Sequence, residues 1–222
     1  MPARRGRPPK TEAGLSRQAV LDAGLRLMRR DGLDALTMRA LAAELDVRAT
    51  SLYRYLPSKD ALLDALADEL FAGLDVSGLV GADWRASLAA MARAIREYLL
   101  ARRDAARLIA GRFTTGYGLR NIEAMLAVLR AAGLSDRDAA FALYGFATTI
   151  FGLVAAEQNR VAGDTPPREY LDGLADRLRG ASRDGYPNVV DLAAELTAPD
   201  LAGRYEFTVA RLIDGIASLG PG

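Results

Sequence analysis

Residues 36–70 read LTMRALAAELDVRATSLYRYLPSKDALLDALADEL, and this stretch decides the fold. Thr37 can cap a short helix, because its hydroxyl can accept a bond from a free backbone N–H and the following apolar residues recur at helical spacing. Residues 46–48 interrupt that helix, and a second short helix is predicted over 49–55. A Pro-Ser pair ends the second helix, and a longer one begins at Lys59. Two short helices across a tight turn are the arrangement that lets the second enter a DNA major groove.

The whole chain is predicted to be all-α, because Ala, Leu and Arg dominate and no stretch alternates in the way strands do. Residues 1–15 are expected to form a basic, flexible N-terminal arm. A three-helix helix-turn-helix domain is predicted over 16–74, and a larger helical domain over 84–220. Residues 75–83 are the expected linker, and 163–188 the least regular segment. In the larger domain, helices are predicted over 84–102, 104–110, 119–132, 135–161 and 201–219.

Charge and composition exclude several classes of function. Residues 1–60 carry 12 Lys or Arg against 7 Asp or Glu, whereas 61–222 carry 17 against 21. A basic first quarter suits a module that binds phosphate. The chain has no Cys and no His, which removes disulfides, thiolate nucleophiles and the commonest general base and metal ligand. We therefore expect no cofactor, no metal site and no enzymatic activity.

No segment of the sequence suggests membrane insertion or export. The start, MPARRGRPPK, lacks the apolar core of a signal peptide. The most apolar segment, 141–156, is flanked by charge and is shorter than the roughly 18 residues that a membrane span needs. The expectation is a soluble, cytoplasmic protein.

Residues 16–74 resemble the DNA-binding domain of the TetR (tetracycline-repressor) family of bacterial regulators. The resemblance lies in T-x-R-x-L-A-x-x-L at 37–45, L-Y-R-Y-L at 52–56 and K-x-A-L-L at 59–63. Asp46 is a departure, since the family usually has Gly in the turn. Asp tolerates a left-handed backbone better than most residues, so we expect the turn to survive.

A DNA-contacting set is predicted on and around the second short helix, where short or forked donors can reach base edges and phosphates. The resemblance implies that Tyr53 and Lys59 contact the DNA backbone. Arg54 either makes a bidentate bond to guanine or clamps a phosphate without reading sequence. The predicted set in this domain is Thr37, Arg39, Arg48, Thr50, Ser51, Tyr53, Arg54, Tyr55 and Lys59.

The N-terminal arm adds Arg5 and Arg7 to the predicted DNA contacts. Its run Arg-Gly-Arg-Pro resembles the core of AT-hook peptides, whose arginines enter a narrow A·T-rich minor groove. A plain basic tail that attracts DNA without sequence preference remains the alternative.

The larger domain is expected to be a sensor. Residues 146–160 and 205–216 resemble the C-terminal domain of tetracycline repressors, which implies a pocket for a small effector. Tetracycline repressors grip a magnesium–drug chelate partly through histidine, and this chain has none. Apolar walls with a few hydroxyls suit an uncharged or amphipathic organic molecule, although each residue could instead be core. The predicted pocket residues are Met91, Ile95, Ile109, Phe113, Asn121, Met125, Tyr144, Thr148 and Phe151, and Gln158 is a further polar candidate.

The two apolar helices near the end of the chain are expected to form a homodimer, as the resemblance implies, with burial inside one subunit as the alternative. The candidate interface residues are Phe141, Phe146, Ile150, Leu153, Phe207, Leu212 and Ile216.

These observations favour a ligand-responsive transcriptional regulator. In this family such a regulator is most often a repressor released from a palindromic double-stranded operator by an effector, whose identity the sequence does not give. A constitutive or architectural DNA-binding protein is the alternative. A helical enzyme with a DNA-binding tether is a third possibility, but no paired-carboxylate or Ser/Lys site stands out.

Overall fold

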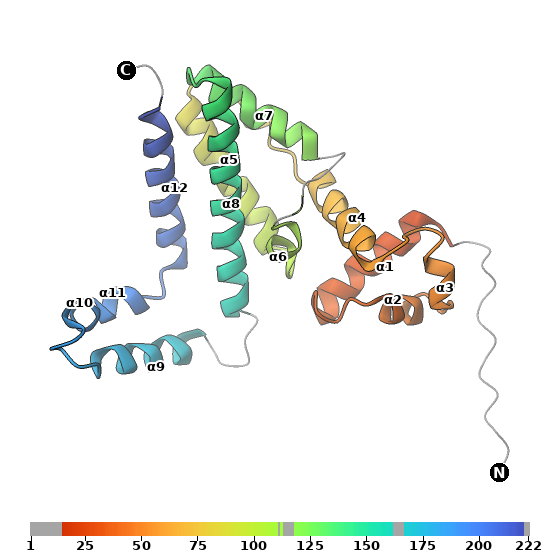
Figure 1. The fold of residues 1–222 in the computed structure, drawn as a ribbon, viewed down its shortest axis with the longest axis horizontal. Helices are drawn as coiled ribbons and strands as arrows, with labels where there is room; N and C mark the ends of the chain where they lie inside the picture. The colour runs from red at the N-terminus through yellow and green to blue at the C-terminus, as the bar shows by residue number, and fades with distance from the viewer. Residues whose placement is uncertain (1–14, 111, 113–117, 162–166, 220–222) are drawn as a thin grey trace, which may run out of the picture.

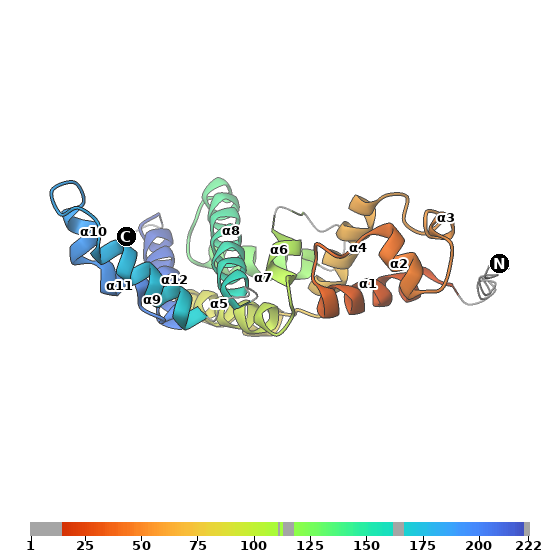
Figure 2. The same ribbon diagram turned by 90° about the horizontal axis from the view of Figure 1, so that it is seen from below.

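The computed structural model describes residues 15–110, 112, 118–161 and 167–219, and every regular element in this part of the chain is a helix. The head contains α1 (Arg17–Asp31), α2 (Met38–Glu44), α3 (Ala49–Leu52) and α4 (Lys59–Ala72). After a short 3₁₀ turn, η1 (Ser77–Leu79), the body contains α5 (Trp84–Leu100), α6 (Ala105–Ile109), α7 (Gly118–Ala131), α8 (Asp136–Val161) and α12 (Leu201–Ala217). Between α8 and α12 a projection contains α9 (Pro167–Arg179), α10 (Pro187–Asp191) and α11 (Ala193–Thr197). Head and projection lie at opposite ends of the molecule (Figures 1 and 2).

The helix starts predicted in the head are present. The hydroxyls of Ser16, Thr37 and Ser58 each accept a bond from the backbone N–H three residues later, at 3.0–3.1 Å. Such a cap contributes about 1 kcal/mol to helix stability. Asp46 has φ 54°, which is the left-handed conformation that the turn requires.

Two elements differ from the predictions. The second short helix was predicted over 49–55, but α3 ends at Leu52 and continues as a tighter turn, in which the Tyr55 N–H bonds to the Leu52 carbonyl at 2.9 Å. Pro57 disfavours helical backbone in the residue before it, which limits the length of α3. The segment 163–188 was expected to be the least regular part of the chain, yet it contains the whole of α9. A proline in the first turn of a helix is compatible with helical backbone, so the Pro-rich start of α9 does not prevent it.

A single hydrophobic core runs from the head into the body. It includes Leu21 and Leu66 in the head and Met91, Leu99 and Phe146 in the body, and all five side chains are fully buried. Burial of each such side chain stabilises the fold by roughly 1.5–3 kcal/mol. The connecting helix α4 packs on α1 as well as on α6 and α7, and it therefore belongs to both parts.

Helix α8 lies at the centre of the body and contacts α5, α6, α7 and α12 (Figure 1). Its segment 136–159 is long and apolar enough to cross a membrane, because its most apolar 18-residue window has a mean hydropathy of 1.8, and the expectation that no segment reaches that length was wrong. Core helices of soluble proteins also meet this criterion. Only 22 % of the most apolar window is buried, which leaves one face of α8 uncovered in a single chain.

The α9–α11 projection packs mainly on itself. Leu171, Ala175 and Ala193 are buried between its helices and lie outside the main core. Leu192 and Leu196 are 51 % and 48 % exposed. The projection therefore presents apolar side chains that the body of its own chain does not cover.

Candidate DNA interface and effector-binding body

Helix α3 is held firmly against the rest of the head. Leu52 is completely buried and Leu56 is 3 % exposed, so both anchor the segment in the core. The Val47 N–H bonds to the Ala42 carbonyl at 3.0 Å across the turn between α2 and α3. This packing sets the angle at which α3 would meet DNA.

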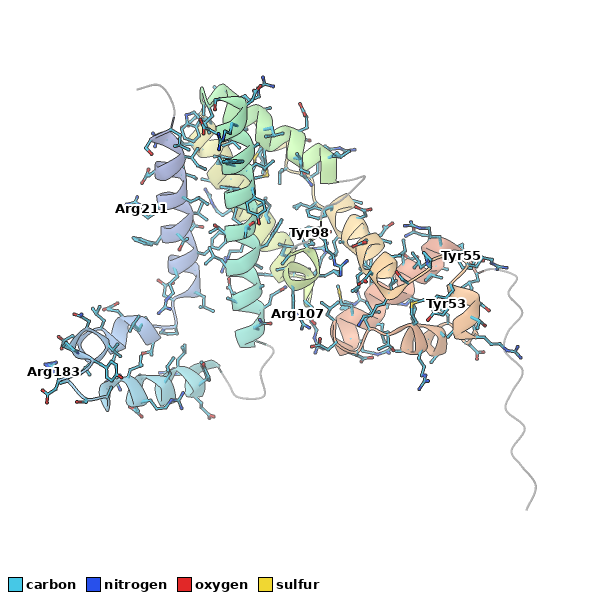
Figure 3. All side chains as sticks on the ribbon, in the orientation of Figure 1. Tyr53, Tyr55, Tyr98, Arg107, Arg183 and Arg211 are labelled. Carbon is cyan, nitrogen blue, oxygen red and sulfur yellow. The ribbon has the colours of Figure 1, made fainter. Side chains whose placement is uncertain are left out.

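Most of the predicted DNA contacts lie exposed on α3 or at neighbouring helix starts. Tyr53 directly follows α3 and is 48 % exposed (Figure 3). Thr37 and Arg39 lie at the start of α2, and Lys59 opens α4, where free backbone N–H groups favour phosphate. The exposed members are Thr37, Arg39, Arg48, Thr50, Tyr53, Arg54 and Lys59, while Ser51 is partly buried. Arg5 and Arg7 lie outside the described residues.

Tyr55 has a different role from the predicted phosphate contact. Its ring is partly buried, and its hydroxyl donates a 2.6 Å bond to the Leu15 carbonyl. The Arg54 guanidinium donates to the same hydroxyl at 2.9 Å and lies 5.0 Å from the centre of the ring. In this structure Tyr55 therefore fastens the start of the head to the end of α3.

Four of the predicted effector-binding residues converge in the middle of the body. Met91, Ile95, Ile109 and Met125 come from α5, α6 and α7 and are each 5 % exposed or less. Phe151 of α8 is partly buried and meets Phe71 of α4 edge-on, with 6.3 Å between the ring centres. Phe113 lies outside the described residues.

The two predicted polar ligands are occupied by the chain's own backbone. The Asn121 side chain accepts a bond from the Val76 N–H at 3.1 Å and donates to the Leu74 carbonyl at 2.9 Å. Gln158 donates to the carbonyls of Leu99 and Arg102, both at 2.7 Å. Asn121 thus holds the linker on α7, and Gln158 holds the end of α5 on α8.

Tyr144 and Thr148 were predicted to line the pocket, but both are exposed on α8, with Tyr144 at 65 %. Phe141 on α8 and Phe207 on α12 are 63 % and 67 % exposed. Arg137 lies over the Phe141 ring and Arg211 over the Phe207 ring, at 5.1 and 5.7 Å (Figure 3 labels Arg211). We call Phe141, Tyr144 and Phe207 the outer face.

The other predicted dimer residues lie deeper. Phe146, Ile150 and Ile216 are at most 3 % exposed, and they therefore pack in the core of their own chain and not on its surface. Leu153 and Leu212 are partly buried. Helical periodicity placed all of these residues on apolar helices but did not distinguish the inward from the outward side of α8.

A cavity of about 170 Å³ lies between α8 and α12. Its lining residues are Leu153, Ala156, Glu157, Leu201, Arg204 and Tyr205. None of the predicted effector-binding residues is among them. Glu157 is held there by a bidentate pair with Arg96 at 2.7 and 3.0 Å.

Helix α4 is fixed to the body at its C-terminal end. Tyr98 of α5 donates a 2.7 Å bond to the Leu70 carbonyl, and burial raises the pKa of its hydroxyl. A tyrosine hydroxyl is already protonated near neutral pH, and the raised pKa extends its role as a donor to higher pH. A Cβ added at Gly73 would lie 2.4 Å from the Tyr98 oxygen, so this close approach depends on glycine.

A second attachment joins the body to the last turn of α1 and to the loop after it, and we call it the latch. The Asp104 carboxylate accepts a 2.8 Å bond from the Leu33 N–H, and Arg103 donates to the Arg30 carbonyl at 2.8 Å. Arg107 pairs with Asp34 and lowers the pKa of that carboxyl by hydrogen bonding (Figure 3 labels Tyr98 and Arg107). Sequence reasoning missed the latch, because its partners lie 71 to 73 residues apart and no local pattern marks them.

A helix-turn-helix with exposed donors on and beside α3, attached to a larger all-α body, defines a helix-turn-helix DNA-binding protein. Residues 20–66 match the family model for bacterial regulatory proteins of the tetR family, and 78–219 match the tetracyclin repressor-like C-terminal domain. The chain therefore belongs to the TetR family of transcriptional regulators.

Individual relatives agree with this assignment. The chain is 36 % identical over 208 residues to the class A tetracycline repressor from transposon 1721 of Escherichia coli, covering 91 % of both chains. The Streptomyces coelicolor protein ActR, in complex with actinorhodin, superposes with a TM-score of 0.82 at 29 % identity, over 93 % of this chain and 97 % of ActR. A possible TetR-family regulator of S. coelicolor A3(2) gives a TM-score of 0.77 at 38 % identity, over 91 % and 99 %.

Proposed function

We propose that this regulator is a dimeric repressor that leaves a palindromic operator when a largely apolar organic molecule enters the body. The observation that carries the proposal is the contact between Phe71 of α4 and Phe151 of α8. It joins the connecting helix directly to the predicted effector-binding wall. A molecule that displaces Phe151 must also move Phe71, and with it the helix that carries the head.

The proposed switch acts through the distance between two heads. Each copy places α3 in one half-site, and half-sites about one helical turn apart tolerate little change in that distance. Tyr98 holds the Leu70 carbonyl beside Phe71, and Asn121 holds the linker just after α4, so a displacement of Phe71 would act at the end of α4 that joins the head to the body. The effector must bind the released conformation more tightly, since equal affinity for both conformations shifts nothing.

A polycyclic, uncharged or amphipathic molecule is the effector class that we propose. Met91 and Met125 supply flexible, polarisable walls that can adapt to a flat ring system. One relative is a tetracycline repressor, the structure of another contains bound actinorhodin, and a related kind of ligand would suit this body. A magnesium–tetracycline chelate is not expected to act, since the chain has no histidine.

A second copy is the proposed cover for the outer face and for the projection. Phe141 and Phe207 are large apolar side chains that are mostly exposed in a single chain, and exposed apolar patches of this kind mark interaction sites. Leu192 and Leu196 on the projection add apolar surface beyond the body. An interface on α8 and α12 would also account for the low burial of α8 without requiring a membrane.

Fluorescence anisotropy with an operator tests this proposal. A duplex is first selected from a random DNA library by the full-length protein, and actinorhodin, magnesium–tetracycline and a panel of uncharged polycyclic compounds are then titrated. We expect at least one organic compound to release the duplex and magnesium–tetracycline to leave it bound. Tight binding that no compound relieves would support the constitutive alternative, and release by micromolar magnesium–tetracycline would contradict the proposed pocket chemistry.

The Phe151→Ala variant tests the proposed route. It should still bind operator and still show a thermal shift with the active compound, yet need a higher concentration for release. Leu119→Ala, at a 55 % exposed position on α7, is the matched control and should behave as the wild type.

A further inference from the structure

The cavity between the end of α8 and the start of α12 is separate from the predicted effector-binding wall. Its volume is about 170 Å³, and it lies where these two helices approach the projection (Figure 1). Leu153 and Ala156 of α8 and Leu201 of α12 form its apolar walls. A cavity of roughly 150 Å³ with apolar walls is large enough to hold benzene. The space therefore suits an apolar group of about the size of one aromatic ring.

One side of the cavity contains a fixed and neutralised acid. Glu157 in the lining pairs with Arg96 of α5 at 2.7 and 3.0 Å, and the two side chains are only 14 % and 19 % exposed. The Arg96 guanidinium also lies 5.2 Å from the centre of the Tyr205 ring. Tyr205 is buried, and its hydroxyl donates to the Ala92 carbonyl at 2.6 Å. Glu157 is thus held in place and already has its counter-charge.

Arg204 gives the other side of the cavity a positive charge that no acid offsets. Its Nη2 donates to the carbonyls of Glu195 and Leu196, at 2.7 and 2.8 Å, and so joins α12 to the end of α11. The neighbouring Asp200 carboxylate caps α12 instead, by accepting from the Gly203 N–H at 2.7 Å. Within the described residues, no carboxylate forms an ion pair with Arg204. A guanidinium is a planar fork of N–H donors, so Arg204 can bind an organic anion and keep its bonds to α11.

We propose that this cavity is a second binding site, for a small apolar monocarboxylate whose carboxylate pairs with Arg204. Its apolar group would contact Leu153 and Leu201, and the bound molecule would connect α8 to α12. Because Arg204 also holds the end of α11, the ligand would stabilise the junction between the body and the projection. The site uses none of the residues predicted to bind the effector, so occupation of one site does not exclude occupation of the other.

A second copy of the chain is the competing occupant, because Leu153 was also predicted to lie in the dimer interface. The charged side chains over the rings of the outer face are Arg137 and Arg211, which would not neutralise Arg204. Covering an unpaired guanidinium with apolar side chains is costly. The charge of the cavity therefore favours a small anion over the outer face of a partner.

Methyl NMR of the full-length protein tests the proposal with three probes of similar size: benzoate, benzyl alcohol and benzylammonium. The ring current of a bound probe should shift the methyl signals of Leu153 and Leu201. The methyl signals of Met91 and Met125, in the predicted effector-binding wall, should stay in place. Benzoate should bind at least about tenfold more tightly than the other two probes, because only benzoate can form a charge-assisted pair with Arg204.

Two variants assign the binding to this cavity. Arg204→Gln keeps a donor for the α11 carbonyls but removes the charge, so the affinity for benzoate should fall to that for benzyl alcohol. Ala156→Phe, at an exposed position in the lining, should fill the cavity and abolish the shifts at Leu153 and Leu201 while Arg204 is kept. Ala127→Phe, at an exposed position on α7, is the matched control and should bind benzoate as the wild type does.

Three results would overturn the inference: equal affinity for the three probes, unchanged benzoate affinity in Arg204→Gln, or shifts confined to Met91 and Met125. Benzoate binding that appears only when Phe141→Asp with Phe207→Asp separates the two copies would also overturn it. That result would show that a second copy, and not a small anion, covers the cavity.

Discussion

Tyr53 and Arg54 are adjacent in sequence, but they differ in their surroundings. Tyr53 is 48 % exposed, whereas the Arg54 guanidinium lies against the Tyr55 ring. Replacing both by alanine should abolish specific operator binding, since a bidentate Arg–guanine contact alone is worth about 1–3 kcal/mol of discrimination. A mobility-shift assay at physiological salt measures the loss, and light scattering should still show a dimer. Retained operator affinity would show that Tyr53 and Arg54 do not belong to the DNA interface.

Local interactions at single residues could be predicted from sequence, and distant ones could not. Thr37 and the left-handed Asp46 act within three residues of their own positions, where the sequence pattern is sufficient. Tyr55, Asn121 and Gln158 each bond to backbone 40 or more residues away. Nothing beside these residues in the sequence indicates such partners, so their roles became visible only in the fold.

Among the helices, α4 depends on a close approach that sequence alone does not reveal. Gly73→Ala would place a Cβ 2.4 Å from the Tyr98 oxygen and force α4 away from α5. We expect a loss of about 1–3 kcal/mol in the free energy of unfolding, as for other overpacked sites. Adding Tyr98→Phe should restore part of that loss, because it removes the clashing oxygen. Urea denaturation of both single variants and the double variant measures the coupling, and strictly additive effects would contradict this account.

The latch gives a second test at the level of elements. Asp104→Ala leaves the Leu33 N–H without its acceptor and puts alanine at φ 58°, so we expect a loss of about 1–3 kcal/mol in unfolding free energy. Asp104→Asn keeps an acceptor and tolerates the left-handed backbone, and it should cost clearly less. Urea denaturation compares the two, and equal losses would show that hydrogen bonding at Asp104 does not stabilise the latch.

For the whole molecule, the outer face should determine whether two copies of the chain form a dimer. Phe141→Asp with Phe207→Asp would put two carboxylates into the proposed interface, where unpaired charge is costly. Light scattering should then give the mass of a monomer, and operator affinity should fall because the two heads no longer bind together. Leu119→Asp on α7 is the control and should remain dimeric. A dimer that survives the double change would place the interface elsewhere.

At this scale, sequence predicted the all-α architecture but not which sides of the helices are buried. The helical pattern of the head and the apolar content of α8 were sufficient to predict the all-α architecture. The prediction of which side chains are buried failed at Phe146 and Ile150, which are fully buried, and at Tyr144, which is exposed. All three lie on the long apolar α8, where nearly every position is apolar and periodicity carries little information.

The latch also limits how this regulator can be re-engineered. Fusing its head to a foreign sensor at the linker near residues 75–83 would leave the loop after α1 without Arg103 and Asp104, which satisfy its backbone. The exchangeable unit is therefore not the 16–74 segment alone. We expect a chimera that carries α6 and the turn before it together with the head to be more stable than a hybrid cut at the linker, which would leave the Leu33 N–H and the Arg30 carbonyl without these partners.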